Sequence, residues 1–271
     1  MKQVYYEIEQ NQEIADHVFR MLLFGDTSAV TTPGQFVNIR LESRFLRRPI
    51  SVCDCTDQKL TLIYKVVGQG TEQLSHVPAG SKLDLLTGLG NGYDCSLSGP
   101  APLLIGGGAG VPPLYWLCRK LLEQGKDPTV ILGFNTAAEV FYEEEFRALG
   151  AQVLVATVDG SCGEQGFVTD VMLKLEQQRM KAKRLSPEYQ TVQTGDFAPA
   201  DAPFYSYFYT CGPMPMFRAI QEVAQTSGQF SFEERMGCGF GACMGCSCKT
   251  LTGSKRICVD GPVLQREEII W

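Results

Sequence analysis

The chain has 271 residues, of which 44% are hydrophobic and 20% are charged, and its formal net charge at pH 7 is −6. This length accommodates two or three domains, and the composition is that of a packed globular protein rather than a disordered one. The acidic balance argues against a nucleic-acid-binding protein, which would present a basic face. Since the chain has only two histidines, neither a histidine-rich metal site nor a Ser-His-Asp triad is expected.

Neither a membrane span nor a secretory signal is expected. No apolar run approaches the roughly 20 residues that a transmembrane helix needs. The first residues carry Lys2, Glu7 and Glu9 in place of an apolar segment. Five of the 11 cysteines fall between Cys238 and Cys258. This clustering favours a cytoplasmic protein with a cysteine-ligated metal centre over a disulfide-stapled secreted domain.

The N-terminal part of the chain is predicted to be rich in β-structure. Short runs that alternate in polarity or carry β-branched residues are separated by Gly, Pro and Asp turns, as in Val4–Ile8, Phe36–Leu41 and Leu60–Val67. Several short strands at this spacing indicate a small antiparallel β-barrel, which we place at residues 1–98.

Strands and helices alternate after residue 98. Strands are predicted at Leu103–Ile105, Val130–Gly133 and Val153–Thr157, and an aromatic strand at Phe204–Thr210. Helical stretches are predicted near Leu114–Gln124, Ala138–Leu149 and Val168–Gln178. This alternation is typical of a parallel sheet with crossover helices, so residues 99–228 are predicted to form an α/β nucleotide-binding domain.

Two segments stand outside this alternation. The polar stretch Lys181–Pro203 contains Pro, Gly and Asp and is predicted to be an insertion loop. Residues 229–271 are rich in cysteine and glycine and are predicted to form a small third domain. The expected fold is therefore a multi-domain α and β protein with a barrel, a parallel-sheet domain and a C-terminal metal-binding domain.

The cysteines of the third domain follow a metal-ligand pattern. Cys238, Cys243 and Cys246 are spaced C-x4-C-x2-C, and Cys258 follows at a distance. This is the spacing of plant-type [2Fe–2S] clusters. Cys248 could compete with Cys258 as the fourth ligand, although two ligands spaced C-x-C would strain the loop. A structural zinc site is the alternative, but the second C-x2-C pair of a zinc ribbon is missing.

Glycines surround these cysteines. Positive φ angles at glycine would let the loop curve so that backbone N–H groups face the cluster sulfurs. The glycines concerned are Gly237, Gly239, Gly241 and Gly245.

A basic strand end offers a site for a pyrophosphate and a flavin ring. An arginine can fork onto the phosphate, and a serine hydroxyl or backbone donors can reach the ring. The residues concerned are Arg48, Pro49, Ile50 and Ser51, with Ile63, Tyr64 and Lys65 on the next long strand and Gly70 and Thr71 at a turn into a helix. N–H groups at such a turn can approach phosphate. Taken singly, these features are equally typical of a solvated strand end, a barrel-wall aromatic and a plain turn.

Two turns of the predicted sheet join strands to helices and carry glycine. The first contains Gly107, Gly108 and Gly110 but lacks the G-x-G-x-x-G spacing, and the second contains Cys211, Gly212 and Pro213. Both would lie at the carboxyl ends of parallel strands, where ligands bind in such sheets, so a nicotinamide nucleotide is expected there. A glycine-rich loop without a ligand is the alternative. No acidic residue can be named as the ribose reader, so the residues do not decide between NADH and NADPH.

In combination and order, these motifs resemble the ferredoxin reductase superfamily, and more closely the electron-transfer subunits of class 1B dihydroorotate dehydrogenases. The resemblance rests on Arg48–Ser51, Gly70-Thr71, Gly106–Leu114, Phe141–Glu144, Cys211–Pro213, Glu234–Cys248 and Cys258–Pro262. It implies FAD between the barrel and the sheet, NADH as electron donor, and a [2Fe–2S] cluster on Cys238, Cys243, Cys246 and Cys258. It also implies a heterotetramer with an FMN-containing catalytic subunit that interconverts dihydroorotate and orotate in pyrimidine biosynthesis.

Two other functions stay open on the sequence alone. Subunits of this kind also serve ferredoxin-dependent transhydrogenases, sulfide dehydrogenases and some hydrogenases, and nothing in the sequence names the electron acceptor. An alternative of another class is a zinc-stabilised, non-catalytic interaction module whose flavin site has been lost. The intact Arg48–Ser51 and Gly70-Thr71 motifs disfavour this alternative.

Overall fold

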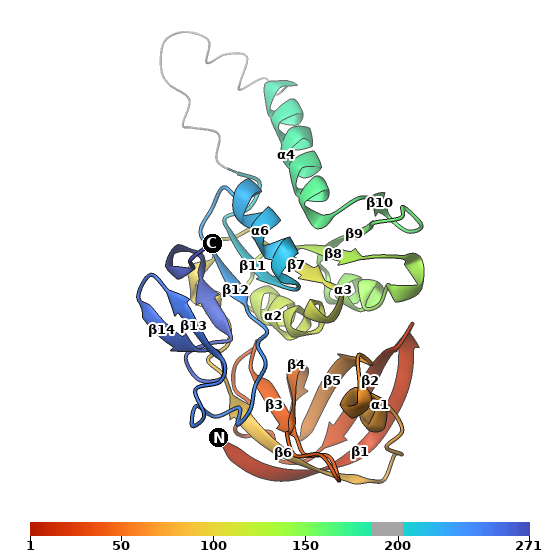
Figure 1. Ribbon diagram of the computed structural model, residues 1–271. Helices are drawn as coiled ribbons and strands as arrows, with labels where there is room; N and C mark the ends of the chain where they lie inside the picture. The colour runs from red at the N-terminus through yellow and green to blue at the C-terminus, as the bar shows by residue number, and fades with distance from the viewer. Residues whose placement is uncertain (186–202) are drawn as a thin grey trace.

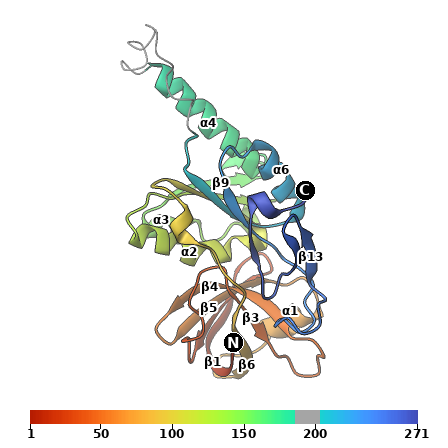
Figure 2. The ribbon, with the colours of Figure 1, turned by 90° about the vertical axis from the view of Figure 1, so that its left-hand side faces the viewer.

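The computed structural model describes residues 1–185 and 203–271. A barrel, an α/β sheet domain and a C-terminal segment pack against one another, and in both views the C-terminal segment runs along the side of the sheet down to the barrel (Figure 1, Figure 2). No helix in the described residues is long and apolar enough to cross a membrane.

The N-terminal part is a closed antiparallel barrel with strand order β1-β2-β5-β4-β3-β6, which confirms the prediction. The strands are β1 (Lys2–Ala15), β2 (Val18–Phe24), β3 (Phe36–Ile39), β4 (Arg48–Thr56), β5 (Lys59–Lys65) and β6 (Lys82–Leu89), with helix α1 (Gln69–Ser75) between the last two. Side chains alternate between the two faces of each strand. Val37 and Ile39 of β3, and Ile50 and Val52 of β4, point into the barrel core. Their neighbours on these strands therefore face outward.

The second part is a seven-stranded sheet in the order β10-β9-β8-β7-β11-β12-β15. All neighbouring strands run parallel except β15, which is antiparallel to β12. The strands are β7 (Pro102–Gly107), β8 (Thr129–Phe134), β9 (Gln152–Thr157), β10 (Glu164–Gln165), β11 (Tyr207–Cys211), β12 (Gly228–Ser231) and β15 (Val263–Gln265). The expected parallel sheet is confirmed, with its edge strands added.

Helices cover both faces of this sheet. Helices α2 (Pro112–Glu123) and α3 (Glu143–Leu149) pack with Leu104 and Val130 on one face. Helices α4 (Val168–Leu185) and α6 (Met214–Val223) pack with Leu103, Ile105 and Ile131 on the other face. Both faces of the central strands are buried, which explains why these strands are continuous apolar runs.

Two helical predictions need correction. The helix expected near Ala138–Leu149 is a 3-10 turn, η3 (Ala137–Glu139), followed by α3, because Tyr142 between them adopts a left-handed φ of 64°. Helix α4 continues to Leu185, so the prediction that the insertion loop begins at Lys181 is wrong. Neither Gly nor Pro interrupts the strong helix formers of α4, and the helix therefore propagates. The rest of the predicted loop, through residue 202, lies outside the described residues.

The C-terminal segment leaves the sheet and returns to it. It departs at β12, forms the hairpin of β13 (Ser247–Thr250) and β14 (Gly253–Arg256), and rejoins the sheet at β15 before the short turn η4 (Arg266–Glu268). The domain boundaries at 98/99 and 228/229 stay predictions, and the second one falls within β12.

Polar contacts of Arg119 and Asp16 join the barrel to the sheet domain. Arg119 of α2 forms an ion pair with Asp54 of β4 and donates to the carbonyl oxygen of Cys55 at 3.0 Å. The backbone N–H of Asp16, at the tip of the β1–β2 hairpin, donates to the carbonyl oxygen of Ala138 at 3.0 Å. These contacts hold the barrel against the sheet domain. The interface between the two, called the seam below, is where the candidate cofactor sites lie.

A half-buried ion pair fixes the start of β4. Both terminal nitrogens of Arg47 lie 3.0 Å from Oδ1 of Asp84 on β6, and Nη2 also lies 3.0 Å from Oδ2. Arg47 additionally donates to the backbone carbonyl of Asn38 at 3.2 Å. One side chain thus ties β3, β4 and β6 together.

Replacing Asp84 by Asn should lower the free energy of unfolding by about 2 kcal/mol. The side chain of Asp84 is 8% exposed and that of Arg47 is 20% exposed, so the substitution leaves a poorly hydrated guanidinium without its counter-charge. Equilibrium chemical denaturation measures the difference between the wild-type chain and Asp84→Asn.

The matched control is Lys59→Gln, which breaks the ion pair between Lys59 and Glu9. These side chains are 60% and 37% exposed, and their pair is expected to contribute less than about 1 kcal/mol. Equal losses in the two variants would contradict the anchoring role of Asp84.

Candidate functional site

Arg48 is the second of two consecutive arginines in the basic motif Arg47–Ser51, and it lies over the turn that contains Gly70. A Cβ atom at Gly70 would stand 2.0 Å from Nε of Arg48. Nη1 of Arg48 donates to the carbonyl oxygen of Leu46 at 2.8 Å, and within the described residues Arg48 forms an ion pair with no carboxylate. Arg48 is therefore a cation available to an anionic ligand, unlike Arg47.

Thr71 shapes the turn before α1. Its Oγ1 accepts the N–H of Val67 at 2.9 Å and of Gly68 at 3.3 Å, and it donates to the carbonyl oxygen of Gly68 at 3.0 Å. The hydroxyl is thus engaged in local structure, so contacts of this turn with a ligand fall to its backbone and to Arg48 above Gly70.

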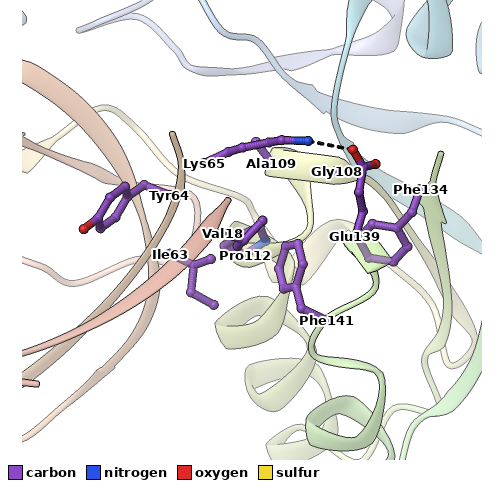
Figure 3. A pocket seen from close by; sticks show the side chains of 10 residues that line it. All are labelled: Val18, Ile63, Tyr64, Lys65, Gly108, Ala109, Pro112, Phe134, Glu139 and Phe141. Atoms are coloured by element: carbon purple, nitrogen blue, oxygen red, sulfur yellow. Dashed lines mark hydrogen bonds and ion pairs between the residues drawn. The ribbon is translucent and has the colours of Figure 1, made fainter. Parts of the chain in front are cut away.

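The three candidates on β5 point in different directions (Figure 3). Tyr64 turns away from the seam, where its hydroxyl donates to Oδ1 of Asn11 at 2.9 Å and its ring stacks on Phe19. Burial raises the pKa of the Tyr64 hydroxyl. The side chain of Tyr64 is therefore a barrel-wall aromatic, while Ile63 and Lys65 face the sheet domain.

Lys65 reaches across the seam. Its Nζ lies 2.8 Å from Oε1 of Glu139 in η3, and this hydrogen bond lowers the pKa of the Glu139 carboxyl (Figure 3). Glu139 also accepts the backbone N–H of Asn135 at 3.1 Å and its side-chain amide at 2.9 Å. The sequence reasoning missed Glu139, although its position just after the carboxyl end of β8 is where ligands bind in parallel sheets.

A cleft of about 550 Å³ opens at the carboxyl edge of the sheet. It brings together both predicted turns, with Gly107, Gly108 and Gly110 from one and Gly212 and Pro213 from the other. Lys65 from the barrel and Phe134, Asn135 and Glu139 from the sheet domain complete its inner wall. Its size and position are those of a nucleotide site at a sheet edge.

Close backbone packing explains the glycines of these turns. A Cβ atom at Gly110 would lie 2.2 Å from the carbonyl oxygen of Cys211, and one at Gly107 would lie 2.6 Å from the sulfur of Met216. Cys211 is buried behind the turn, and burial raises the pKa of its thiol. Cys211 is therefore a neutral thiol in this fold.

Glu233 also lines the cleft and was not singled out from the sequence. It follows β12, and although its side chain keeps solvent contact, desolvation by the surrounding protein raises the pKa of its carboxyl. The sequence signal that could have identified it is an acidic residue just after a parallel strand of a nucleotide-binding sheet.

The four predicted cluster cysteines converge in the C-terminal segment. The N–H of Cys238 donates to the sulfur of Cys243 at 3.4 Å, and the N–H of Cys243 donates to the sulfur of Cys238 at 3.4 Å. Burial and, after it, the neighbouring Cys246 and Cys238 raise the pKa of the Cys258 thiol, so these three side chains lie near one another. Cys248 instead lies on β13 opposite Lys255. The arrangement favours Cys258 over Cys248 as the fourth ligand.

The cysteine loop stabilises an ionised sulfur at Cys238. Desolvation opposes ionisation of Cys238, but backbone N–H groups of Phe240, Cys243 and Ala242 bond to its sulfur and lower the pKa of Cys238 to about 6. Such N–H···S contacts stabilise metal thiolates. The donor set and its surroundings therefore fit an iron–sulfur cluster.

The glycines of this loop act in two ways, which corrects the expectation that all of them adopt positive φ. Gly239 and Gly241 do so, at 77° and 90°, and Met244 supplies a third left-handed position at 58°. Gly237 instead leaves room for sulfur, because its Cβ atom would lie 3.2 Å from Sγ of Cys243, whereas a Cβ atom at Gly245 would stand at an ordinary contact distance of 3.5 Å.

Comparison with known proteins agrees with this arrangement. Residues 104–222 match the model of the oxidoreductase NAD-binding domain, and residues 233–270 match that of the iron-sulfur cluster binding domain of dihydroorotate dehydrogenase B. The electron transfer subunit of dihydroorotate dehydrogenase B (NAD(+)) from Bacillus pumilus is 40% identical over 281 residues, covering 99% of this chain and 98% of the relative. The chain belongs to this family of electron transfer subunits.

Further family members extend the match. The dihydroorotate dehydrogenase B electron transfer subunit of Fusobacterium nucleatum is 39% identical, covering 97% of this chain and 96% of its own. Among solved structures, an NADH-dependent reduced ferredoxin-NADP oxidoreductase superposes with a TM-score of 0.79 at 29% identity, covering 98% of this chain and 90% of that one. As an electron transfer subunit, the chain has a catalytic partner subunit. The matches lend no support to a zinc-stabilised interaction module.

Replacing Cys258 by Ser should abolish the cluster, whereas replacing Cys248 by Ser should preserve it. Of these two cysteines, Cys258 is affected by two other candidate ligands, Cys246 and Cys238, whereas Cys248 is affected by Cys246. Iron and sulfide content of anaerobically purified variants measures the outcome, with visible absorbance as a second readout. Retention of iron in Cys258→Ser together with its loss in Cys248→Ser would reverse the ligand assignment.

Proposed function

We propose that this chain passes electrons from NADH, through FAD and a [2Fe–2S] cluster, to the FMN-containing catalytic subunit of dihydroorotate dehydrogenase in pyrimidine biosynthesis. The observation that carries the proposal is the convergence of three sites on one seam. Asn38 of β3 holds the cysteine loop and pairs with Pro49 of the basic motif, and the cleft of the sheet domain includes Lys65 of β5, the strand next to β4.

FAD is held by the barrel. Arg48 and the backbone at Gly70 bind the pyrophosphate, because the guanidinium stands directly over a residue without a side chain. Pro49 and Ser51, on the outer face of β4, contact the flavin, and the Ile50 contact comes from its backbone, because its side chain points into the barrel. Ile63 and Lys65 approach it from β5, and the Tyr64 contact comes from its backbone.

NADH binds in the cleft of the sheet domain. Its phosphates lie against Gly107, Gly108 and Gly110, and the nicotinamide end approaches Gly212 and Pro213, behind which Cys211 is buried. The NAD(+) in the names of the relatives supports NADH over NADPH.

The residues of this chain bind, orient and shield the reactants. The bound groups supply the redox chemistry: the flavin accepts a hydride and releases single electrons, and the cluster carries one electron at a time. Cys238, Cys243, Cys246 and Cys258 hold the cluster beside the flavin strand. No general base is needed, which accords with the scarcity of histidine.

The assembly is proposed as a heterotetramer of two electron transfer subunits and two FMN-containing catalytic subunits, located in the cytoplasm. The cysteine side chains support this location, since all of them are free of disulfide bonds. The division into residues 1–98, 99–228 and 229–271 is proposed for the FAD, NAD and cluster domains.

One observation favours a different electron acceptor. The ferredoxin-NADP oxidoreductase structure resembles this chain over 98% of its length, so a subunit of a ferredoxin-dependent transhydrogenase is the competing function.

The deciding experiment is an anaerobic pull-down of the tagged chain from its native host. Co-purification of an FMN protein and NADH-dependent orotate reduction are expected, and Cys246→Ser should abolish orotate reduction while NADH-dependent dye reduction continues. Reduction of dyes and of NADP⁺ with ferredoxin, with orotate inert, would instead identify the transhydrogenase function. A colourless protein would contradict both.

Replacing Gly70 by Ala should weaken FAD binding by about 10-fold or more, because the new methyl group displaces the Arg48 guanidinium from the phosphate position. Fluorescence titration of the flavin-free chain with FAD measures the dissociation constant.

Gly68→Ala is the matched control in the same turn. Nothing lies within 4 Å of a Cβ atom at Gly68, and its backbone is extended, with φ 177°. Its FAD affinity should stay within about twofold of wild type, the range usual for a change that removes no contact. Equal weakening in both variants would show that the turn, rather than Arg48, is at fault.

A further inference from the structure

Asn38 joins the barrel to the cysteine loop. It lies on β3 with 1% of its surface exposed, and its Nδ2 donates to the carbonyl oxygen of Cys238 at 3.2 Å. A carbonyl oxygen only accepts hydrogen bonds, so this contact fixes which end of the Asn38 amide is the nitrogen. The orientation of its Oδ1 atom is therefore determined as well.

The oxygen end of this amide is buried and has no donor. Within the part of the chain that the structure describes, no N–H or O–H group reaches Oδ1 of Asn38. Buried acceptors are nearly always satisfied in native proteins, because leaving one unpaired is destabilising. The missing donor points to a group that this fold is built to receive.

Strand geometry places Asn38 beside the flavin motif. Asn38 pairs with Pro49 across the β3–β4 ladder, and Phe36 pairs with Ser51. Val37 and Ile50 point into the barrel, so the residues between and beside them on these strands lie on its outer face, namely Phe36, Asn38, Pro49 and Ser51. Side chains directly opposite in such a ladder have Cβ atoms about 5 Å apart. The Asn38 amide thus stands between the flavin strand and the cysteine loop.

The backbone of the cysteine loop packs closely against the side chain of Asn38. A Cβ atom at Gly239 would lie 2.3 Å from Nδ2 of Asn38, and Gly239 has a φ of 77°. The backbone carbonyl of Asn38 is in turn held by Arg47 at 3.2 Å. The amide is therefore fixed at both its backbone and its nitrogen end.

The chemistry of the two bound groups identifies the donor. The sulfides and thiolates of an iron–sulfur cluster only accept hydrogen bonds, whereas a flavin carries a ring N–H and ribityl hydroxyls that donate. We propose that Asn38 is a positioning residue that spans the two sites, with Nδ2 holding the cluster loop and Oδ1 accepting an N–H or O–H of the flavin. This inference rests on the proposed function.

The test compares Asn38→Leu with Asn91→Leu in the full-length, cluster-loaded chain. Asn91 is the matched control, because its side chain also ties the barrel side to the C-terminal segment, with Nδ2 donating to the carbonyl oxygen of Val263 at 2.8 Å and Oδ1 accepting the N–H of Val263 at 3.1 Å. Both of its ends are satisfied by protein. Loosening of the C-terminal segment alone would therefore affect both variants.

Asn38→Leu should weaken FAD binding by about fivefold, the effect expected for one neutral hydrogen bond, and should reduce the rise in melting temperature that FAD produces. Asn91→Leu should bind FAD like the wild type. FAD titration followed by fluorescence and thermal melting with and without FAD measure these effects.

A second variant tests the roles of Nδ2 and Oδ1 separately. It also replaces Asn38→Leu in the test if that variant does not fold. Asn38→Asp keeps an acceptor for the flavin but replaces the donor to Cys238, so it should change the paramagnetic resonance spectrum of the reduced cluster while retaining FAD. Loss of FAD with an unchanged cluster spectrum would overturn the assignment of the two ends.

Two further results would overturn the proposal. FAD affinity in Asn38→Leu equal to that of the wild type would show that water satisfies Oδ1, and equal weakening in Asn91→Leu would show a general loosening. A wild-type chain that binds no FAD would contradict the proposed function itself, and this inference with it.

Discussion

The ion pair between Arg47 and Asp84 is the constraint on which the rest of the site depends. The pair engages the first of two consecutive arginines and fixes the start of β4, while Arg48, which has no ion pair within the described residues, lies above Gly70. Arg47 also holds the carbonyl of Asn38, and so sets the position of β3 beneath the cysteine loop. Identical neighbouring side chains thus take opposite roles, one structural and one directed at a ligand, because alternate positions at a strand end face different surroundings.

The seam lies between two well-packed bodies. Helices cover both faces of the sheet, and the barrel is closed. Lys65 and Glu139 connect the barrel to the sheet domain at the inner wall of the cleft. The glycine turns and Lys65 of the barrel therefore line one cleft across this junction.

Much of this could be predicted from the sequence. The barrel, the parallel sheet, the glycine turns and the cysteine spacing each carry a local signal, and the structure brings the members of each motif together. Residues whose roles depend on distant partners could not be found in this way. Asn38 contacts a residue 200 positions away, and Glu139 meets Lys65 across 74 positions. Tyr64 is a different case. The motif identifies its position on β5, but it does not tell which way its side chain points. The full extent of α4 is hard to predict because its last turns are polar, like a loop, although their residues are strong helix formers.

The return of the C-terminal segment to the sheet has a consequence for electron transfer. Because β12 and β15 pair with each other, the cysteine-bearing excursion is pinned at both ends to the same rigid body. A domain attached by one flexible linker can shuttle its redox centre between donor and acceptor. This chain has no such freedom, so the donor-to-cluster separation is set once by folding. Delivery to the partner must then rely on docking of the two subunits, and the rate within this chain should be insensitive to solvent viscosity.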